Sequence, residues 1–469
     1  MAAGSTAPSA DERYSRHRLA PGFDQAALVS RSLFRFSLGA TGADPVGDHL
    51  GRLAAAMGVE RQTVVAAAPE RASVRSAARS MLLNPRVQID LVSLELGVAL
   101  ARAEVAAGRP PFVVISLPPD PASAIEHGAA LAARLPEAAV RFVARQRGAV
   151  VVGERAEPVA RRGAALGTGE EGLLAGLHGV EAAAHLLGDF LAVVGAWSDR
   201  GGAPMPRAPE LEVFQACAGT APPEPRPLCL LLVGAGGALA HGFLEATLEE
   251  PVLRAALAGG RLLLVDPDQY DGSNLSRQTL AEGPHRLGQP KAAVTAAVLR
   301  DRWGSGAPEL WPILDRFEPR LLDEHRPHAV GLFADNLAAR ALATRALGAH
   351  PGSLILNAGT EFTLGHARAV AVGERGLCLD CGPEALAEAA EEERRQEAGR
   401  ASCAQELTAS NVLTNALTGA LSARQLARYL AGEGVEPRQR WVNWRLPART
   451  AAGPLLPACA CHEGAGRAP

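Results

Sequence analysis

The chain has 469 residues, 48% of them hydrophobic, and a formal net charge of −3, so it can bury a large core but carries no basic stripe for nucleic acid. It has no uninterrupted apolar stretch of about 18 residues or more, which speaks against a membrane span. Its first residues lack the apolar centre of a signal peptide. We therefore expect a cytoplasmic protein whose partners are neither membranes nor nucleic acids.

In chain order, the sequence predicts two α/β units joined by a linker. Residues 1–12 are small and polar and are expected to be disordered. Strand-like and amphipathic helix-like stretches alternate over 13–199, as in a mostly parallel sheet covered by helices. Residues 200–227 are rich in Pro, Ala and Gly, which is typical of a linker, and the alternation resumes over 228–462. The tail, 463–469, is again expected to be disordered.

The two units look like an internal repeat. LFRFSLGATGADPVGDHL (33–50) aligns without gaps on LCLLLVGAGGALAHGFLE (228–245). Three further pairs follow in the same order: FVVISLPPD with AVGLFADN, GAVVVG with ARAVAVG, and the helix-like 172–191 with 412–432. Four matches in one order favour a repeat over chance similarity between Ala- and Gly-rich segments.

The second unit opens with a strand, a glycine turn and a helix start, LCLLLVGAGGALAHG. Gly234, Gly236 and Gly237 let the backbone approach a ligand closely, and free N–H groups at the helix start attract an anion. The same pattern is found in NAD-binding sites and in purely structural turns. By itself it therefore does not identify the ligand, or show that there is one.

Polar residues further along the chain help to decide between ATP and NAD as the ligand. Asp266 closes a strand, where a carboxylate can accept hydrogen bonds from a ribose, which also fits a dinucleotide enzyme. Arg277 and Lys291 add two cations near the glycine loop, which suits a triphosphate whose α-phosphate is attacked. Asp335 follows another apolar strand and is placed to hold Mg²⁺. The combination favours ATP over NAD.

The motifs Gly-x-Gly-Gly, Asp-x-Asp, SNLxRQ, GQPK and DNxxxR, followed by a Cys pair, resemble the ThiF/MoeB/E1 superfamily over about 228–462. These enzymes adenylate the C-terminal glycine of a ubiquitin-like or sulfur-carrier protein. The resemblance implies that Asp266 binds ribose and that Asp335 holds Mg²⁺. The implied ATP site consists of Gly234, Gly236, Gly237, Asp266, Asp268, Asn274, Arg277, Gln278, Lys291, Asp335 and Asn336, with Asn274, Arg277 and Lys291 facing the phosphates.

Two cysteine pairs predict a structural zinc site in the second unit. Cys378 and Cys381 have the spacing that lets two thiolates share a tetrahedral Zn²⁺, and Cys459 and Cys461 supply a second half. The family usually has two intervening residues in both halves, whereas this chain has one in the second half. His462 stands beside that pair and could replace one ligand. Cysteines used in this way suit a reducing compartment.

Cys403 is a candidate nucleophile. It follows a highly charged stretch and precedes an apolar helix, within a segment, 382–411, that we expect to be an exposed crossover. An unpaired cysteine near a helix start is either an inert thiol or a reactive thiolate. Its position matches the loop cysteine of the family, and a thiolate there would capture the adenylated acyl group as a thioester.

The first unit carries none of these motifs after its glycine turn. It therefore resembles an adenylation fold without its chemistry, as in eukaryotic ubiquitin E1 enzymes and in compact E1-like proteins of bacterial ubiquitin-like (Bil-type) antiphage operons. The arm RYSRHRLAPGFDQ (13–25) resembles the family arm whose arginine reaches into the ATP site of the dimer partner. By this resemblance Arg16, or as second choice Arg13, crosses to the second unit.

These observations predict two Rossmann-like adenylation domains in tandem, forming a pseudo-dimer within one chain and so needing no obligate homodimer. The expected function is adenylation of a ubiquitin-like protein with ATP and Mg²⁺, then thioester formation on Cys403 and transfer to an E2-like protein, in bacterial antiphage defence. Arg16, Arg277, Lys291 and Cys403 are the expected catalytic residues. The alternatives are a sulfur-carrier adenylyltransferase, an NAD-dependent oxidoreductase and a non-catalytic scaffold.

Overall fold

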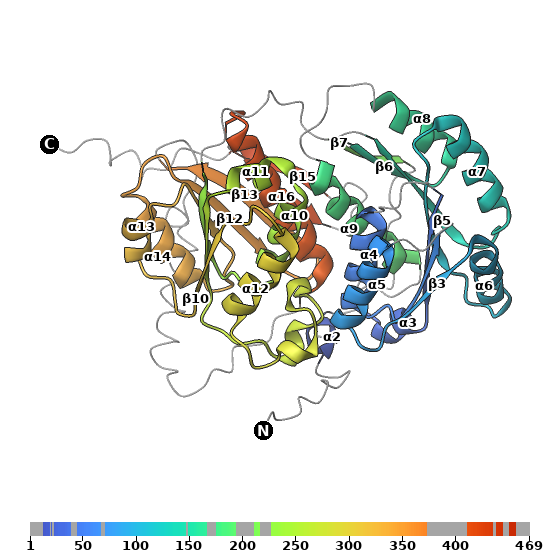
Figure 1. Ribbon diagram of the computed structural model, residues 1–469, viewed down its shortest axis with the longest axis horizontal. Coiled ribbons are helices and arrows are strands. Elements are labelled where there is room, and N and C mark those ends of the chain that lie inside the picture. The colour runs from blue at the N-terminus through green and yellow to red at the C-terminus, as the bar shows by residue number, and fades with distance from the viewer. Residues whose placement is uncertain are drawn as a thin grey trace.

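The computed structural model contains two β-sheets with helices packed between and around them (Figure 1). The structure describes residues 13–18, 20, 23–38, 45–66, 71–146, 149–166, 175–193, 211–215, 227–372, 410–434, 438–443 and 450–455.

The first sheet has the strand order β3-β2-β1-β4-β5-β6-β7. Its first five strands in this order pair in parallel, and β6 and β7 are added antiparallel. The strands are β1 (Ser32–Ser37), β2 (Arg61–Ala66), β3 (Gln88–Val92), β4 (Phe112–Ser116), β5 (Ala139–Gln146), β6 (Ala149–Gly153) and β7 (Leu211–Gln215).

The second sheet repeats this arrangement as β10-β9-β8-β11-β12-β13-β14, and β15 is added at its end. Parallel pairing again holds from β10 to β12, and antiparallel pairing from β12 onward. The strands are β8 (Cys229–Val233), β9 (Arg261–Val265), β10 (Glu309–Ile313), β11 (Ala329–Leu332), β12 (Leu354–Thr360), β13 (Leu364–Ala371), β14 (Arg438–Asn443) and β15 (Thr450–Leu455). The prediction of an α/β fold with two mostly parallel sheets is confirmed.

Helices connect the strands, as parallel pairing requires. In the first half they are α2 (Ser15–Arg18), α3 (Gln25–Val29), α4 (Pro45–Met57), α5 (Arg71–Leu83), α6 (Leu94–Ala106), α7 (Pro121–Ala133), α8 (Ala156–Leu166) and α9 (Ala175–Val193). In the second half they are α10 (Ala238–Glu249), α11 (Pro251–Leu257), α12 (Lys291–Trp303), α13 (Arg320–His325), α14 (Leu337–Leu347) and α16 (Val412–Leu430), with short 3₁₀ turns η1 (Gly272–Asn274), η2 (Thr279–Ala281) and η3 (Pro284–Arg286).

The two halves meet through a layer of four helices that lies between the sheets (Figure 1). Helices α4 and α9 of the first half pack against α10 and α16 of the second. A Cβ on Gly242 would collide with the carbonyl oxygen of Asn415, and one on Gly419 with the backbone nitrogen of Phe243, so α10 and α16 touch backbone to backbone. Buried apolar side chains of both halves, such as Phe190 and Phe243, form one continuous cluster. The layer is therefore a shared hydrophobic core.

Two features differ from the sequence expectations. Part of the segment expected to be a linker, 200–227, forms strand β7, which pairs with β6 at the edge of the first sheet. The ungapped alignment of the repeat is also two residues out of register in its first strand. Leu33 lies opposite Phe112, and the equivalent residue opposite Ala329 is Leu230. A shift of two residues keeps every side chain on the same face, so an all-apolar strand does not reveal it.

Within the described residues, no helix is long and apolar enough to span a membrane.

Candidate functional site

The glycine loop joins β8 to α10 at the carboxyl edge of the second sheet. Gly234 has φ of +81°, and a Cβ there would lie 2.6 Å from the Cα of Ala334, so both conformation and space require glycine. The N–H of Gly237, the N-cap of α10, donates to the Gly234 carbonyl oxygen over 3.0 Å. The loop therefore turns tightly and presents the start of α10 to the edge of the sheet.

Asp266 ties the glycine loop to the end of the neighbouring strand. One carboxylate oxygen accepts from the Gly236 N–H at 2.8 Å, and the other accepts from the Asp268 N–H at 3.0 Å. Burial raises the pKa of Asp266, while the charge of Lys291 and these two N–H groups act to lower it. The buried carboxylate therefore fixes the spacing between the loop and the residues that follow β9.

Lys291 begins α12 directly opposite the glycine loop. Its ammonium group lies 3.1 Å from a carboxylate oxygen of Asp268, and its backbone N–H donates to the Asp268 carbonyl oxygen at 2.8 Å. A Cβ on Gly236 would collide with the Cβ of Lys291. Lys291 is the only lysine in the sequence. A chain that otherwise uses arginine for its basic side chains thus has one compact ammonium group, packed against this loop.

The segment 272–281 carries three further predicted residues, all buried. Asn274 accepts from the Asp271 N–H at 3.2 Å, and Arg277 donates to the Ser273 carbonyl oxygen at 2.6 Å. The side-chain oxygen of Gln278 is buried and has no hydrogen-bond partner within the described residues. Turns therefore hold this segment rigidly, and in the described part of the chain the Gln278 side-chain oxygen is left as a buried acceptor without a partner.

Asp335 lies exposed after β11, beside the loop. The neighbouring Asn336 caps α14 by accepting from the Ala339 N–H at 3.1 Å. Arg340 donates from its Nε to the Ala334 carbonyl oxygen at 2.5 Å, and burial lowers its pKa to about 10 against the opposing charge of Asp335. The ends of β8, β9 and β11 are adjacent in the sheet, so this carboxylate, the glycine loop and Lys291 share one edge.

The N-terminal arm crosses from the first half to the second. Arg13 is buried, with 2% of its surface exposed, and donates to the carbonyl oxygens of Leu83 and, over 3.2 Å, of Leu275. Leu275 lies within the SNLSRQ motif. Of the two arginines that the sequence proposed for this crossing, Arg13, the second choice, is the one whose side chain the structure describes. Arg16 lies on α2, and its side chain is outside the described part.

His17 anchors the arm in the same crossing. Its ring lies edge-on to Phe362 of the second half, with 6.2 Å between ring centroids, and its Nδ1 lies 2.9 Å from the side-chain oxygen of Gln25. Burial lowers the pKa of His17 to about 4, with the Gln25 hydrogen bond opposing and the charges of Arg277 and Arg13 adding to the effect. A neutral imidazole and aromatic contacts therefore hold the arm against the second half.

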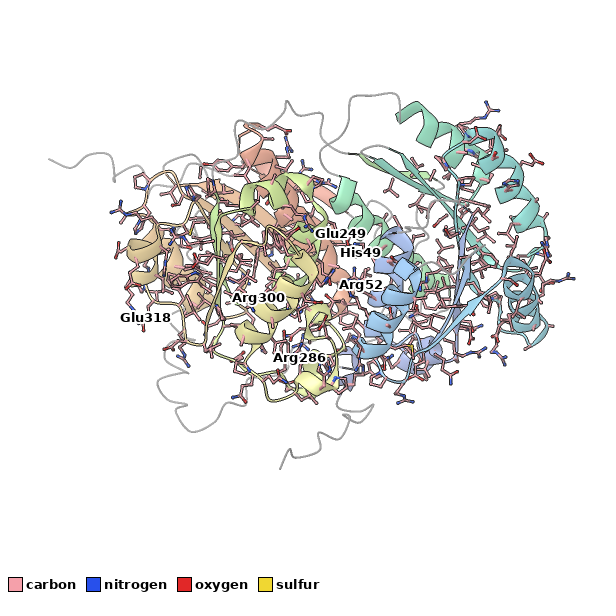
Figure 2. All side chains as sticks on the ribbon, viewed as in Figure 1. His49, Arg52, Glu249, Arg286, Arg300 and Glu318 are labelled. Carbon is pink, nitrogen blue, oxygen red and sulfur yellow. The ribbon has the colours of Figure 1, made fainter. Side chains whose placement is uncertain are left out.

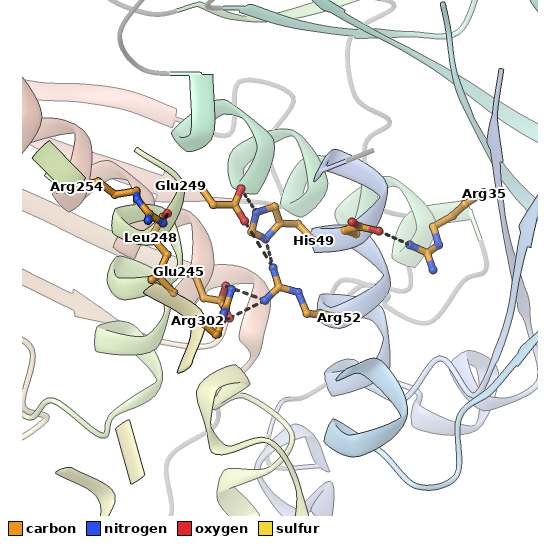
Figure 3. A network of polar contacts seen from close by, with 9 residues as sticks. Arg35, His49, Arg52, Glu245, Leu248, Glu249, Arg254 and Arg302 are labelled. Atoms are coloured by element: carbon orange, nitrogen blue, oxygen red, sulfur yellow. Dashed lines mark hydrogen bonds and ion pairs between the residues drawn. The ribbon is translucent and has the colours of Figure 1, made fainter. Parts of the chain in front are cut away.

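A buried ion cluster, which the sequence did not reveal, joins α4 to α10 and α12 (Figures 2 and 3). Arg52 donates to both oxygens of Glu245, at 2.9 and 2.8 Å, and Arg302 donates to the same two oxygens, each at 2.7 Å. His49 lies 2.5 Å from Glu249 and 2.8 Å from Arg52. We call these five residues the junction cluster.

Within the described residues, His49, Glu245 and Glu249 are also the one group with ligand types and spacing for a metal ion. Two guanidinium groups already bond both oxygens of Glu245, and like-charged neighbours oppose a cation there. The junction cluster therefore serves to join the two halves.

The predicted zinc ligands and the predicted nucleophile lie outside the described residues: Cys378, Cys381, Cys403, Cys459, Cys461 and His462. The expected crossover, 382–411, also lies outside them except for its last two residues.

The solved structures that this chain matches include those of E. coli MccB. The structure of MccB with AMPCPP and selenomethionine MccA is 17% identical, with a TM-score of 0.36, and the match covers 50% of this chain and 66% of that chain. MccB with ATP is 17% identical, with a TM-score of 0.36 and coverage of 50% and 65%. The chain thus spans slightly less than two thirds of the MccB chains it matches. No curated protein matches it significantly.

The comparison with protein families concerns the half of the chain that holds the glycine loop, Asp266 and Lys291. Residues 230–451, slightly less than half of the chain, match the ThiF family, and the matched stretch contains these three features.

Proposed function

We propose that this protein is an E1-like activating enzyme that uses ATP and Mg²⁺ to adenylate the C-terminal glycine of a ubiquitin-like protein. The observation that carries the proposal is the constellation at the edge of the second sheet. Asp266 bonds the glycine loop, Asp268 bonds Lys291, and both follow the same strand, β9. A triphosphate beside this loop would meet N–H groups, a helix start and a point charge, the chemistry that recognises phosphate.

The residues present fit a nucleotide and its metal ion. Glycine at 234 and 236 lets the loop pack closely against Ala334 and Lys291, and Gln278 holds a buried acceptor without a partner among the described residues. Asp335 would hold Mg²⁺ through its side-chain oxygens, and the ion would neutralise phosphate charge. ATP is therefore a better candidate than NAD, for which a lysine and an exposed carboxylate beside the loop have no use.

In the proposed reaction, the terminal carboxylate of the ubiquitin-like protein attacks the α-phosphorus of ATP. A bond forms between carboxylate oxygen and phosphorus, and the bond to the leaving pyrophosphate breaks. Lys291 and Arg277 would stabilise the charge that develops on the phosphoryl oxygens. The rigid mounting of both residues would supply much of the rate through positioning.

The first half would act as the inactive partner of a pseudo-dimer. The two sheets share one strand order, and α4 and α9 pack on α10 and α16. The arm reaches the SNLSRQ motif through Arg13. These contacts support a role in which the first half holds the ATP-site segments in place, with Arg16 as the residue offered to the nucleotide.

The later steps rest on the resemblance of the motifs. Cys403 would take the acyl group as a thioester, for transfer to an E2-like protein in the cytoplasm, and a zinc ion would join Cys378 and Cys381 to Cys459 and Cys461. A role in bacterial antiphage defence belongs to the same proposal.

The experiment is ATP–pyrophosphate exchange with ubiquitin-like proteins that end in glycine, followed by a non-reducing gel. We expect exchange in the wild type, loss of exchange in Lys291→Ala, and a thiol-sensitive adduct that is absent from Cys403→Ala. Exchange without an adduct would point to sulfur-carrier chemistry. Tight NAD binding without exchange would refute the proposal.

The single lysine allows a second test that needs no protein substrate. Pyridoxal 5′-phosphate carries a phosphate and an aldehyde that reacts with amines, so only Lys291 and the N-terminal amine can be labelled. We expect reduction with borohydride to yield one labelled internal peptide, and excess MgATP to suppress that label but not the N-terminal one. Equal suppression at both amines, or at neither, would contradict an ATP site at Lys291.

A further inference from the structure

Three pieces of the candidate ATP site lie far apart in sequence and must be held together: the glycine loop, the segment 272–281 and the start of α12. Each is rigid by itself through its own turns. A buried side chain that bonded all three would set their relative positions, and His241 occupies that place.

His241 lies in the first turn of α10 and is fully buried. Its backbone N–H donates to the carbonyl oxygen of Gly237 at 3.0 Å, which ties it directly to the glycine loop. Its Nδ1 accepts from the N–H of Leu280 at 3.0 Å, which ties it to the 3₁₀ turn η2, just after Arg277 and Gln278. One residue thus bonds two of the three pieces.

The other ring nitrogen reaches the third piece through Tyr270. The Nε2 of His241 lies 3.0 Å from the Tyr270 hydroxyl, which is also buried. The backbone N–H of Tyr270 donates to the Gln289 carbonyl oxygen at 3.0 Å, and Gly288 donates back to Tyr270 at 2.9 Å. Only Pro290, the N-cap of α12, separates residues 288–289 from Lys291, so the chain of bonds ends at the start of α12.

The partners of the ring determine its protonation. Because the Leu280 N–H can only donate, Nδ1 must offer a lone pair, and the single proton of the neutral ring sits on Nε2. Nε2 therefore donates to the Tyr270 oxygen. Burial lowers the pKa of His241 to about 3, with Glu245 opposing and Lys291 adding to the effect, so the ring stays in this neutral form.

We propose that His241 is a positioning residue of the ATP site, whose two ring nitrogens hold the Arg277 segment and the Lys291 segment at fixed places relative to the glycine loop. The expected effect on nucleotide binding rests on the proposed function. The hydrogen bonds of His241 to Leu280 and Tyr270 can be tested without it.

The two nitrogens can be removed separately. The Oδ1 of asparagine can take the place of Nδ1, and the Nε2 of glutamine that of the imidazole Nε2. His241→Asn thus keeps the bond to Leu280, His241→Gln keeps the bond to Tyr270, and His241→Ala keeps neither. His285 is an exposed histidine of the same region, and His285→Ala is the matched control.

Hydrogen exchange measured by mass spectrometry tests the hydrogen bond from the Leu280 amide to His241. The Leu280 amide should exchange slowly in the wild type, His241→Asn and His285→Ala, and much faster in His241→Ala and His241→Gln. Equal protection in the wild type and in His241→Ala would overturn the inference, even if the protein proved to bind no nucleotide.

Calorimetry with AMPCPP and Mg²⁺ tests the consequence, at a temperature below the unfolding of each variant. We expect the Kd to rise about tenfold in His241→Ala, because a buried N–H loses its partner, and to return to within about threefold of wild type in His241→Asn. If His241→Ala only lowers the melting temperature and leaves the Kd unchanged, the residue is merely structural and the inference is wrong. Absence of AMPCPP binding in the wild type would count against the proposed function instead.

Discussion

Removing Arg52 from the junction cluster should weaken the contact between the two halves by a defined amount. Arg52 and Glu245 have 8% and 6% of their side chains exposed, and two charge-assisted hydrogen bonds join them (Figure 3). In Arg52→Met, Glu245 keeps its two bonds to Arg302, so the carboxylate stays compensated. We expect a loss of about 2–3 kcal/mol in the free energy of unfolding, the value of a hydrogen bond to a charged group.

Glu245→Gln should cost more, although it changes a single atom. It leaves the buried guanidinium groups of Arg52 and Arg302 without the carboxylate that bonds both, and Glu249, 3.9 Å from Arg52, remains as a weaker counter-charge. Breaking a buried pair from one side costs about 3–5 kcal/mol, so the predicted order of stability is wild type, then Arg52→Met, then Glu245→Gln.

Urea unfolding followed by circular dichroism measures this order of stability. Thermal unfolding in a calorimeter gives an independent check. Arg134→Met is the matched control, because Arg134 forms a fully exposed pair with Glu95 and should leave the unfolding free energy unchanged. Arg52→Met should also separate the unfolding transitions of the two halves. The reasoning is refuted if Arg52→Met behaves like the control, or if Glu245→Gln is the more stable of the two buried variants.

Three further predictions follow from single residues. Gly236→Ala should abolish AMPCPP binding, measured by calorimetry, because the new Cβ collides with Lys291, and unaltered binding would contradict the loop geometry. Burial raises the pKa of Glu250 to about 8, so its contribution to stability is complete below its ordinary value of 4.5 and is lost as pH rises through 8. Glu250→Gln, which keeps an acceptor for the α11 cap, should therefore melt higher than the wild type at pH 9 but not at pH 5; equal shifts at both pH values would refute this. Arg13→Met should increase proteolysis of the arm and weaken AMPCPP binding, whereas unchanged digestion would show that its bond to Leu275 does not secure the crossing.

Local patterns in the sequence were sufficient for the fold class and for most of the candidate ATP site. A strand, a glycine turn and a helix start are adjacent in sequence, so the backbone preferences of Gly234 and the apolar run before it predict the loop directly. The same holds for Asp266 at the end of β9 and for Lys291 at the start of α12. The carboxyl ends of parallel strands share an edge, so these residues meet once the strand order is known.

Two errors have a common origin in weak local signals. LEVFQ within the Pro-rich stretch 200–227 is short, and only its pairing with β6 makes it a strand. The repeat register was ambiguous because two residues of shift preserve the face of an apolar strand. Local sequence cannot decide either point, since both depend on a partner strand far away in the chain.

The tertiary structure alone decided which polar groups meet across long separations. Arg52 bonds Glu245, Arg13 bonds Leu275, and His241 bonds Leu280 and Tyr270. Arg52 and His241 look unremarkable in sequence, because an arginine or histidine on an amphipathic helix is most often solvated, and Arg13 was only the second choice for the crossing residue. Their hydrogen bonds fix the arrangement of the helices only when the helices around α10 pack together and exclude water. Once buried, a polar group without a partner destabilises the fold, so the paired arrangement is strongly preferred.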